Sequence, residues 1–179
     1  RHLHSFPTRR SSDLERAVIG LNLCPFAKAV HAKDRIRWVL SDATDAEALL
    51  AQLAAELQFL AAADPTEVET TLIVHPRVLA DFADYNDFLD LADAAIEALG
   101  LEGTLQVASF HPDYRFEGTG PDDITNATNR SPFPTLHLLR EDSITQAVAD
   151  TPDADRIVER NLATLRRLGP AGWRRLLED

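Results

Sequence analysis

Residues 105–139, LQVASFHPDYRFEGTGPDDITNATNRSPFPTLHLL, decide how this chain folds. An apolar run at each end is typical of a β-strand, and about twenty polar residues punctuated by proline and glycine separate the two runs. Such a long structureless connection is rare in a compact domain, because ordering it costs entropy and its backbone needs hydrogen-bond partners. We therefore expect two strands, at 104–110 and 135–139, joined by a functional loop.

Outside this stretch, strands and helices alternate along the chain. Two earlier strands are predicted at 35–40 and Thr70–Val74, and the amphipathic helices that follow them are predicted at 44–63 and 78–99. A short helix at 143–149 and a long one ending at Gly169 come last. This alternation predicts an α/β fold: a layered single domain with a mostly parallel four-stranded sheet and helices packed on it.

A thioredoxin-like arrangement is the alternative fold. The segment CPFA at 24–27 resembles the active-site turn of some glutathione transferases, and FPTL at 133–136 resembles the cis-proline that starts a strand in that fold. The residues before Cys24 have helical rather than strand periodicity, which argues against this alternative.

Composition and charge exclude several classes of partner. The chain has 179 residues, of which 45% are hydrophobic and 26% charged, and a formal net charge of −11. A negative balance repels phosphate backbones and anionic membranes, so we expect no nucleic acid and no membrane partner. The apolar runs are much shorter than the roughly 20 residues of a membrane span. With its single cysteine, the chain is expected to be cytoplasmic.

The first fourteen residues, RHLHSFPTRRSSDL, differ from the rest of the chain in being basic and rich in serine. From His4 to Leu14 they resemble the in-frame translation of a sequencing-library adapter. We expect 1–14 to be a disordered, non-native scar and 15–179 to be a single domain truncated at its N-terminus. The alternative is a flexible basic arm.

Two histidines, His75 and His111, each end a predicted strand and precede a proline. Ligands bind outside the carboxyl ends of parallel strands, so we expect these imidazoles to lie together, on neighbouring strands, as catalytic acid/base groups or metal ligands. The alternative is that each imidazole only caps a loop carbonyl. Whether the protein is an enzyme is therefore left open.

Metal and cysteine chemistry have little support. Histidine and cysteine show no HxxxH, CxxC or HExxH spacing, so no metal site is expected, and no motif identifies a cofactor. His137, inside the apolar run TLHLL, is expected to be a hydrogen-bonded sheet residue. Cys24, beside leucine, proline and phenylalanine, is expected to be a small buried hydrophobe rather than an activated nucleophile.

The polar loop supplies the candidate ligand-binding residues. Arg130 is a planar donor suited to carboxylate or phosphate, and Asn126 and Asn129 offer both donors and acceptors. With Asp113, these residues predict a site for a small polar or anionic ligand. The alternative is an internally hydrogen-bonded Ω-loop, in which the same side chains satisfy only the loop's own backbone.

Six segments carry a resemblance to a known family: LNLCPFAKAV, ETTLIVHP, DYNDFLDLAD, QVASFHPDYRFEG, NATNRSPFPTLHLLRED and ERNLATLRRLG. In this order they resemble the domain-of-unknown-function family 1415, an uncharacterised bacterial family, over residues 15–173. The resemblance implies a single domain but no activity, cofactor or catalytic residue. Two interpretations therefore remain: a small enzyme or ligand-binding protein, or a non-catalytic interaction protein that uses its acidic helix faces.

Overall fold

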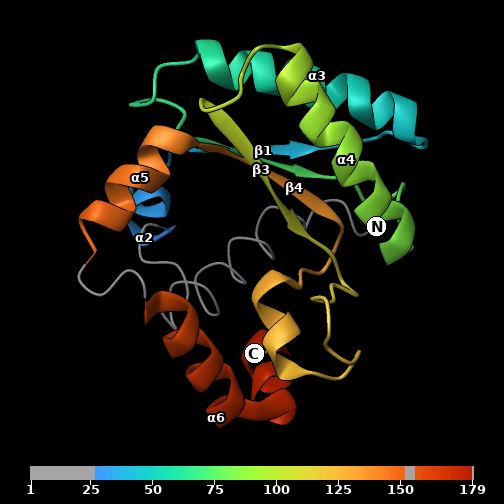
Figure 1. Ribbon diagram of the computed structural model, residues 1–179, viewed down its shortest axis with the longest axis vertical. Helices are drawn as coiled ribbons and strands as arrows, with labels where there is room; N and C mark the ends of the chain where they lie inside the picture. Colours follow the sequence, from blue (N-terminus) through green and yellow to red (C-terminus); the bar gives the residue numbers. More distant parts are fainter. Residues whose placement is uncertain (1–26, 152–155, 179) are drawn as a thin grey trace.

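The computed structural model of the protein describes residues 27–151 and 156–178, which form one four-stranded sheet with helices packed on it (Figure 1). The strands lie in the order β1-β2-β4-β3. Their bounds are Ile36–Leu40 for β1, Thr70–Val74 for β2, Leu105–Phe110 for β3 and Thr135–Arg140 for β4. The expectations for residues 1–14 and for Cys24 lie outside the described residues.

The sheet is mixed, so the prediction of a mostly parallel sheet was wrong. β1 and β2 are parallel, whereas β4 is antiparallel to both β2 and β3. The reason lies in the loop: without a crossover helix, the chain returns directly from β3 and pairs as an antiparallel strand. β4 therefore separates β2 from β3, and the expectation that the two histidines follow neighbouring strands was also wrong.

One face of the sheet is covered by α3 (Ala46–Ala62) and α4 (Phe82–Ala98), as Figure 1 shows. Both helices begin at an aspartate, Asp45 and Asp81, whose carboxylate accepts hydrogen bonds from backbone N–H groups of the first turn. Each buries one stripe of side chains against the sheet at helical spacing. The stripes are Leu49, Leu53, Leu57 and Leu60 in α3, and Tyr85, Phe88, Ala92 and Ile96 in α4.

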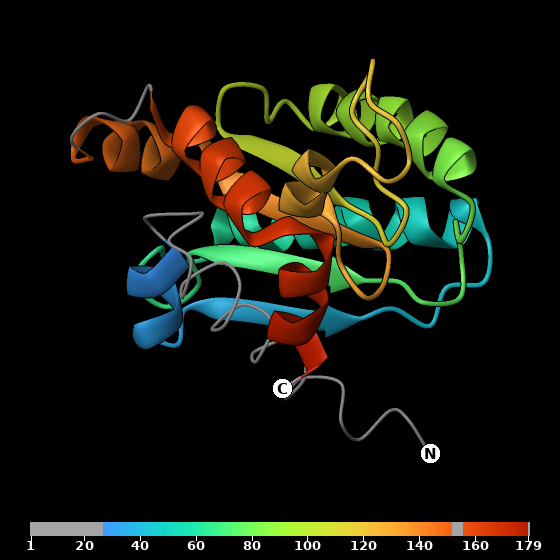
Figure 2. The same cartoon turned by 90° about the horizontal axis from the view of Figure 1, so that it is seen from below.

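The remaining described elements lie around the ends and the other side of the sheet. In Figure 2 the sheet lies between α3, behind it, and α6, in front. α6 was expected to end at Gly169, and the chain does leave helical geometry there, with φ 65°, before a further helical stretch. No described helix combines the length and the apolar character needed to cross a bilayer. The bounds are Ala27–Ala32 for α2, Ile124–Asn129 for the 3₁₀ helix η3, Glu141–Ala149 for α5 and Ile157–Glu178 for α6.

Strand alternation decides which side chains face α3 and α4. Ile73 and Leu136, a pair across β2 and β4, are completely buried in the core on that side. His75 follows Ile73 by two residues, so its side chain continues the same face beyond the strand. His111 has the same relation to Ser109, the partner of Leu136 in β3. The alternation of side chains along β2 and β3 therefore places both imidazoles on the face of the sheet that α3 and α4 cover.

The thioredoxin-like alternative loses its second resemblance. All peptide bonds in residues 27–151 and 156–178 are trans, so the proline at 134 is not a cis-proline at the start of a strand. A central antiparallel strand that follows the loop is the arrangement found instead.

Candidate functional site

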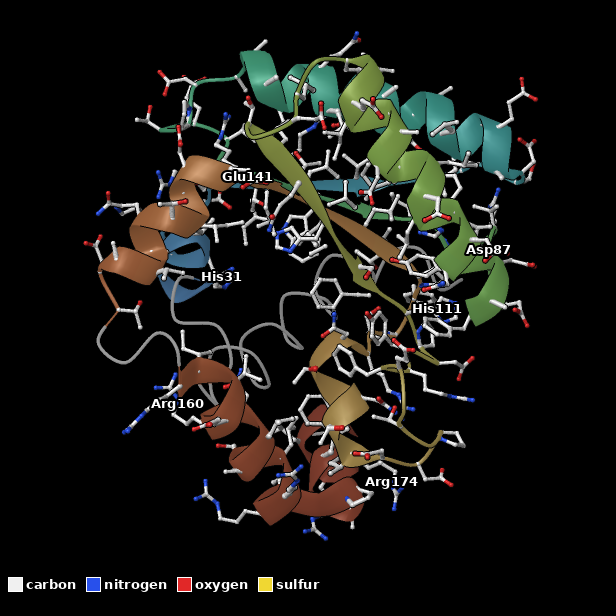
Figure 3. All side chains as sticks on the ribbon, in the orientation of Figure 1. His31, Asp87, His111, Glu141, Arg160 and Arg174 are labelled. Atoms are coloured by element: carbon white, nitrogen blue, oxygen red, sulfur yellow. The ribbon has the colours of Figure 1, made fainter. Side chains whose placement is uncertain are left out.

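Three strand ends meet at the edge of the sheet where β2 and β3 finish and β4 begins. The backbone N–H of His75 donates to the carbonyl of Pro134 at 3.0 Å, and that of His111 donates to the carbonyl of Asn129 at 3.1 Å. Both histidine side chains are completely buried. Figure 3 shows His111 at this edge, beside the start of α4. The returning loop therefore ties the two His-Pro corners to the same place.

Tyr85 of α4 contacts both imidazoles. Its ring centroid is 5.8 Å from that of His75 and 5.0 Å from that of His111. Its hydroxyl donates to the carbonyl of Thr135 at 2.8 Å and accepts from the N–H of Phe110 at 3.0 Å. Tyr85 thus links α4 to the ends of β3 and β4 and contacts both imidazole rings.

The aromatic packing continues outward from His111 toward solvent. Phe82, the first residue of α4, has its ring centroid 5.4 Å from that of His111 and 5.3 Å from that of Tyr114. Tyr114 in turn contacts the exposed Phe116 edge-on at 5.0 Å. We call His75, Phe82, Tyr85, His111 and Tyr114 the aromatic cluster. Its other members, Phe82, Tyr85 and Tyr114, place aromatic rings beside the histidines on the side of α4 and the loop.

His111 has a hydrogen-bond partner on each ring nitrogen. Its Nδ1 accepts from the backbone N–H of Asp113 at 3.0 Å, so this nitrogen carries no proton. Its Nε2 lies 3.1 Å from the carbonyl of Leu79, which can only accept, so Nε2 carries the proton. These bonds describe a neutral imidazole that holds the turn after β3 against the start of α4. Asp113 contributes its backbone N–H, and its side chain is exposed.

His75 differs from His111 because one of its ring nitrogens has no partner. Its Nδ1 donates to the carbonyl of Val78 at 3.1 Å, which leaves Nε2 as an unprotonated acceptor. Nε2 is buried and has no hydrogen bond to the described residues. The pKa of His75 is lowered to about 4, mainly because the ring is buried; the bond to Val78 opposes this shift, and nearby His111 contributes to it. At neutral pH the ring is therefore uncharged, with one free lone pair.

The loop side chains predicted to bind a ligand are occupied within the loop. The Oδ1 atom of Asn126 accepts from the N–H of Phe116 at 3.1 Å and from the hydroxyl of Thr119 at 2.8 Å, and its Nδ2 donates to the carbonyl of Gly120 at 2.9 Å. Asn129 donates from Nδ2 to the carbonyl of Ser109 at 3.1 Å. Asn126 is completely buried. These contacts match the Ω-loop alternative, in which asparagines support the backbone.

Arg130 also braces the loop. Its Nε donates to the carbonyl of Tyr114 at 3.2 Å, and one terminal nitrogen donates to the carbonyl of Pro121. Tyr114 lies in the turn after His111, so Arg130 is at the same edge of the sheet as the histidines. Its other terminal nitrogen has no hydrogen bond within residues 27–151 and 156–178, and the side chain is half-buried. Only this part of the guanidinium is available to a ligand.

Phe82 and Tyr85 were not predicted to be part of the candidate site. Both were placed only on the apolar side of a helix, which is their pattern in the sequence. Their spacing of three residues at the start of a helix, a few residues after the first His-Pro, could have indicated them. His137, by contrast, is a hydrogen-bonded sheet residue as expected, with its Nε2 2.7 Å from the hydroxyl of Thr70. The described residues contain no group of three or more potential metal-ligating side chains.

Comparison with known proteins gives one match. A family model described as "Protein of unknown function (DUF1415)" matches residues 8–175 of the chain. Searches of curated proteins and of solved structures found no match. The matched range begins within the segment expected to be a scar, whose non-native origin stays a prediction.

Proposed function

Because the chain belongs to the DUF1415 family, as its sequence segments predicted, and the description of that family names no activity, we propose a function from the geometry of the chain itself. The protein binds a small polar or anionic ligand where β2 and β3 end, and Nε2 of His75 accepts a hydrogen bond or a proton from it. The observation that carries this proposal is the buried, unpartnered Nε2 atom. An unsatisfied buried acceptor costs about 1–3 kcal/mol, which a ligand N–H or O–H would recover.

The charge state of His75 limits what the site can do. With a pKa of about 4, the imidazole is neutral at pH 7 and a weak base, so accepting a hydrogen bond is its first role. A ligand that brings a negative charge close to the ring would favour the imidazolium and raise this pKa. Such a ligand would turn the acceptor into a base able to take a proton near neutral pH. The site could therefore belong either to a binding protein or to a small enzyme that uses acid/base chemistry.

The other predicted residues support His75 in this proposal. His111 positions the loop, since both its nitrogens are bonded, and its catalytic role stays a prediction. Asn126, Asn129 and Arg130 hold the loop against the strand ends. The free terminal nitrogen of Arg130 is the remaining donor for an anionic group. The ligand is thus recognised mainly through His75, whose ring packs against Tyr85.

The experiment is a ligand screen by thermal shift, with ¹⁵N NMR of the histidine side chains on each hit. His75→Asn is the informative variant, because the Asn amide can still donate to the carbonyl of Val78 but places nothing at the Nε2 position. We expect ligands that stabilise the wild type to move the Nε2 resonance of His75 and to lose most of their effect in His75→Asn. Asn86→Ala, an exposed substitution on α4, is the control and should respond like the wild type. Ligands that stabilise His75→Asn equally well, with the Nε2 resonance unmoved, would refute the proposal.

A second candidate function is a non-catalytic interaction protein. It is favoured by the outward face of α4, where Asp84, Asp87, Asp90, Asp93 and Glu97 are all exposed. If the screen finds no ligand that reaches His75, this candidate becomes the leading one.

A further inference from the structure

The C-terminal helix concentrates positive charge on a chain whose net charge is −11. All arginines of α6, and the arginine just before it, have exposed side chains. Hydrogen bonds from Thr125 are the main reason that the pKa of Asp123 is lowered, and Arg166 also lowers it; the other arginines of this set make no ion pair or hydrogen bond within residues 27–151 and 156–178. We call this set the α6 arginine surface. It comprises Arg156, Arg160, Arg166, Arg167, Arg174 and Arg175.

Most of the described arginines elsewhere in the protein have a partner. Arg37 forms a two-pronged pair with Glu56, and Arg140 donates to three carbonyls at the end of α3. Arg35 pairs with Glu69, and Arg130 braces the loop. Of the described arginines outside the α6 arginine surface, only Arg77 and Arg115 lack such a partner. Apart from Arg166 beside Asp123, the α6 arginine surface has no partner among the described residues, so its donors are open to another molecule.

The opposite charge gathers on α4. This helix has the sequence FADYNDFLDLADAAIEA, which contains no lysine or arginine. Its acidic residues recur every three or four positions on the side away from the core, and all are exposed. We call Asp84, Asp87, Asp90, Asp93 and Glu97 the α4 acidic stripe. None of them forms an ion pair within residues 27–151 and 156–178.

The two surfaces lie on opposite sides of the protein. Figure 1 shows α4 along the upper side and α6 at the lower end. In Figure 3 Asp87 lies at one side of the molecule, while Arg160 and Arg174 project from the other end. The surfaces cannot neutralise each other within one chain, but they can meet between two chains placed head to tail. Arg160 and Arg167 are seven residues apart, as are Asp90 and Glu97, so both pairs repeat at about 10.5 Å along a helix.

We propose that the α6 arginine surface of one copy binds the α4 acidic stripe of a second copy. The contact is heterologous, because each copy uses a different surface, so it propagates into open chains rather than closing as a two-fold dimer. Each exposed ion pair adds little by itself, and several must form together. The association is therefore weak and strongly dependent on salt. This proposal does not rest on the ligand site at His75.

Sedimentation velocity at two salt concentrations tests the proposal on the full chain. Raising NaCl from about 50 mM to about 500 mM shortens the Debye length from about 14 Å to about 4 Å. We expect larger species at low salt that dissociate at high salt. The double variant R160Q/R167Q removes two charges from the α6 arginine surface, and D90N/E97Q removes two from the α4 acidic stripe. Each is expected to weaken self-association by about tenfold.

Mixing the two double variants gives the decisive result. The mixture contains one intact arginine surface and one intact acidic stripe on different chains, so it should form one-to-one pairs about tenfold more tightly than either variant associates with itself. R77Q/R115Q is the matched control, because both arginines are exposed and lie outside α6, and it should associate like the wild type. A wild type that remains monomeric at low salt, or a mixture that does not pair, would overturn the proposal. Binding of an anionic polymer such as heparin by a monomeric wild type would overturn it in favour of a polyanion partner.

Discussion

The imidazole of His75 stacks on the ring of Tyr85, with centroids 5.8 Å apart and ring planes inclined by 15°. The stack joins the end of β2 to α4, and the hydroxyl of Tyr85 extends the link to β3 and β4. The protonation of His75 and the hydrogen bonds of Tyr85 are therefore measurable properties of one cluster at the strand ends.

The first prediction concerns pH. Burial lowers the pKa of His75 from 6.5 to about 4, so the unfolded chain binds a proton at this residue at a pH where the folded chain does not. Folding stability is then lost as the pH falls from 6.5 toward 4. Between about pH 7 and about pH 5, protonation of His75 in the unfolded chain should lower the free energy of unfolding by about 2 kcal/mol. Urea denaturation of wild type and His75→Asn checks this, and equal losses in both proteins would contradict it.

The second prediction concerns the hydroxyl of Tyr85. Tyr85→Phe should lower the unfolding free energy by about 2 kcal/mol, because the carbonyl of Thr135 and the N–H of Phe110 each lose a partner. Tyr114→Phe is the matched control: that hydroxyl makes no hydrogen bond within the described residues, so its removal should change stability by less than about 0.5 kcal/mol. Chemical denaturation measures both, and similar losses would show that the Tyr85 bonds contribute little.

The third prediction concerns the loop. Asn126→Ala should remove three hydrogen bonds from a fully buried side chain and lower stability by about 2 kcal/mol. The loss should be local, so amide hydrogen exchange should accelerate most at Phe116, whose N–H donates to Asn126. Asn86→Ala, on the exposed side of α4, should leave exchange in the loop unchanged. Unchanged protection in Asn126→Ala would mean that the loop is held by other contacts.

The fourth prediction separates two roles of Arg130. If the guanidinium mainly braces the loop, Arg130→Gln should lower the unfolding free energy by about 1–2 kcal/mol, since it donates to the carbonyls of Tyr114 and Pro121. Arg115→Gln removes the same charge at an exposed position and should be nearly neutral. An Arg130→Gln protein of wild-type stability that has lost ligand binding would instead favour the ligand-binding role that the sequence predicted.

Local sequence features predicted most of the elements. The apolar stripes of α3 and α4 recur at helical spacing, and the run Thr70–Val74 is bounded by a His-Pro corner, so these elements depend on neighbouring residues and could be recognised without the fold. The two histidines were placed at one sheet edge for a similar reason: strands that follow crossover helices share a direction, and β2 and β3 do run the same way.

The pairing of β4 could not be predicted in this way. The run TLHLL is apolar enough to be buried on both faces, and that pattern suits any central position in a sheet, parallel or antiparallel. Which strand accepts its backbone hydrogen bonds depends on residues far away in the chain. Its insertion between β2 and β3 separated the two strands that the histidines follow and made the sheet mixed.

The sequence by itself determined the residue types at the candidate site, the helices and strands that carry them, and the family of the chain. Only the tertiary structure decided their roles. Asparagine, arginine and histidine can each bind a ligand or the backbone, and the choice depends on which polar atoms the fold brings within hydrogen-bond distance. Here Asn126, Arg130 and His111 found partners inside the protein, while Nε2 of His75, enclosed by the aromatic cluster, did not.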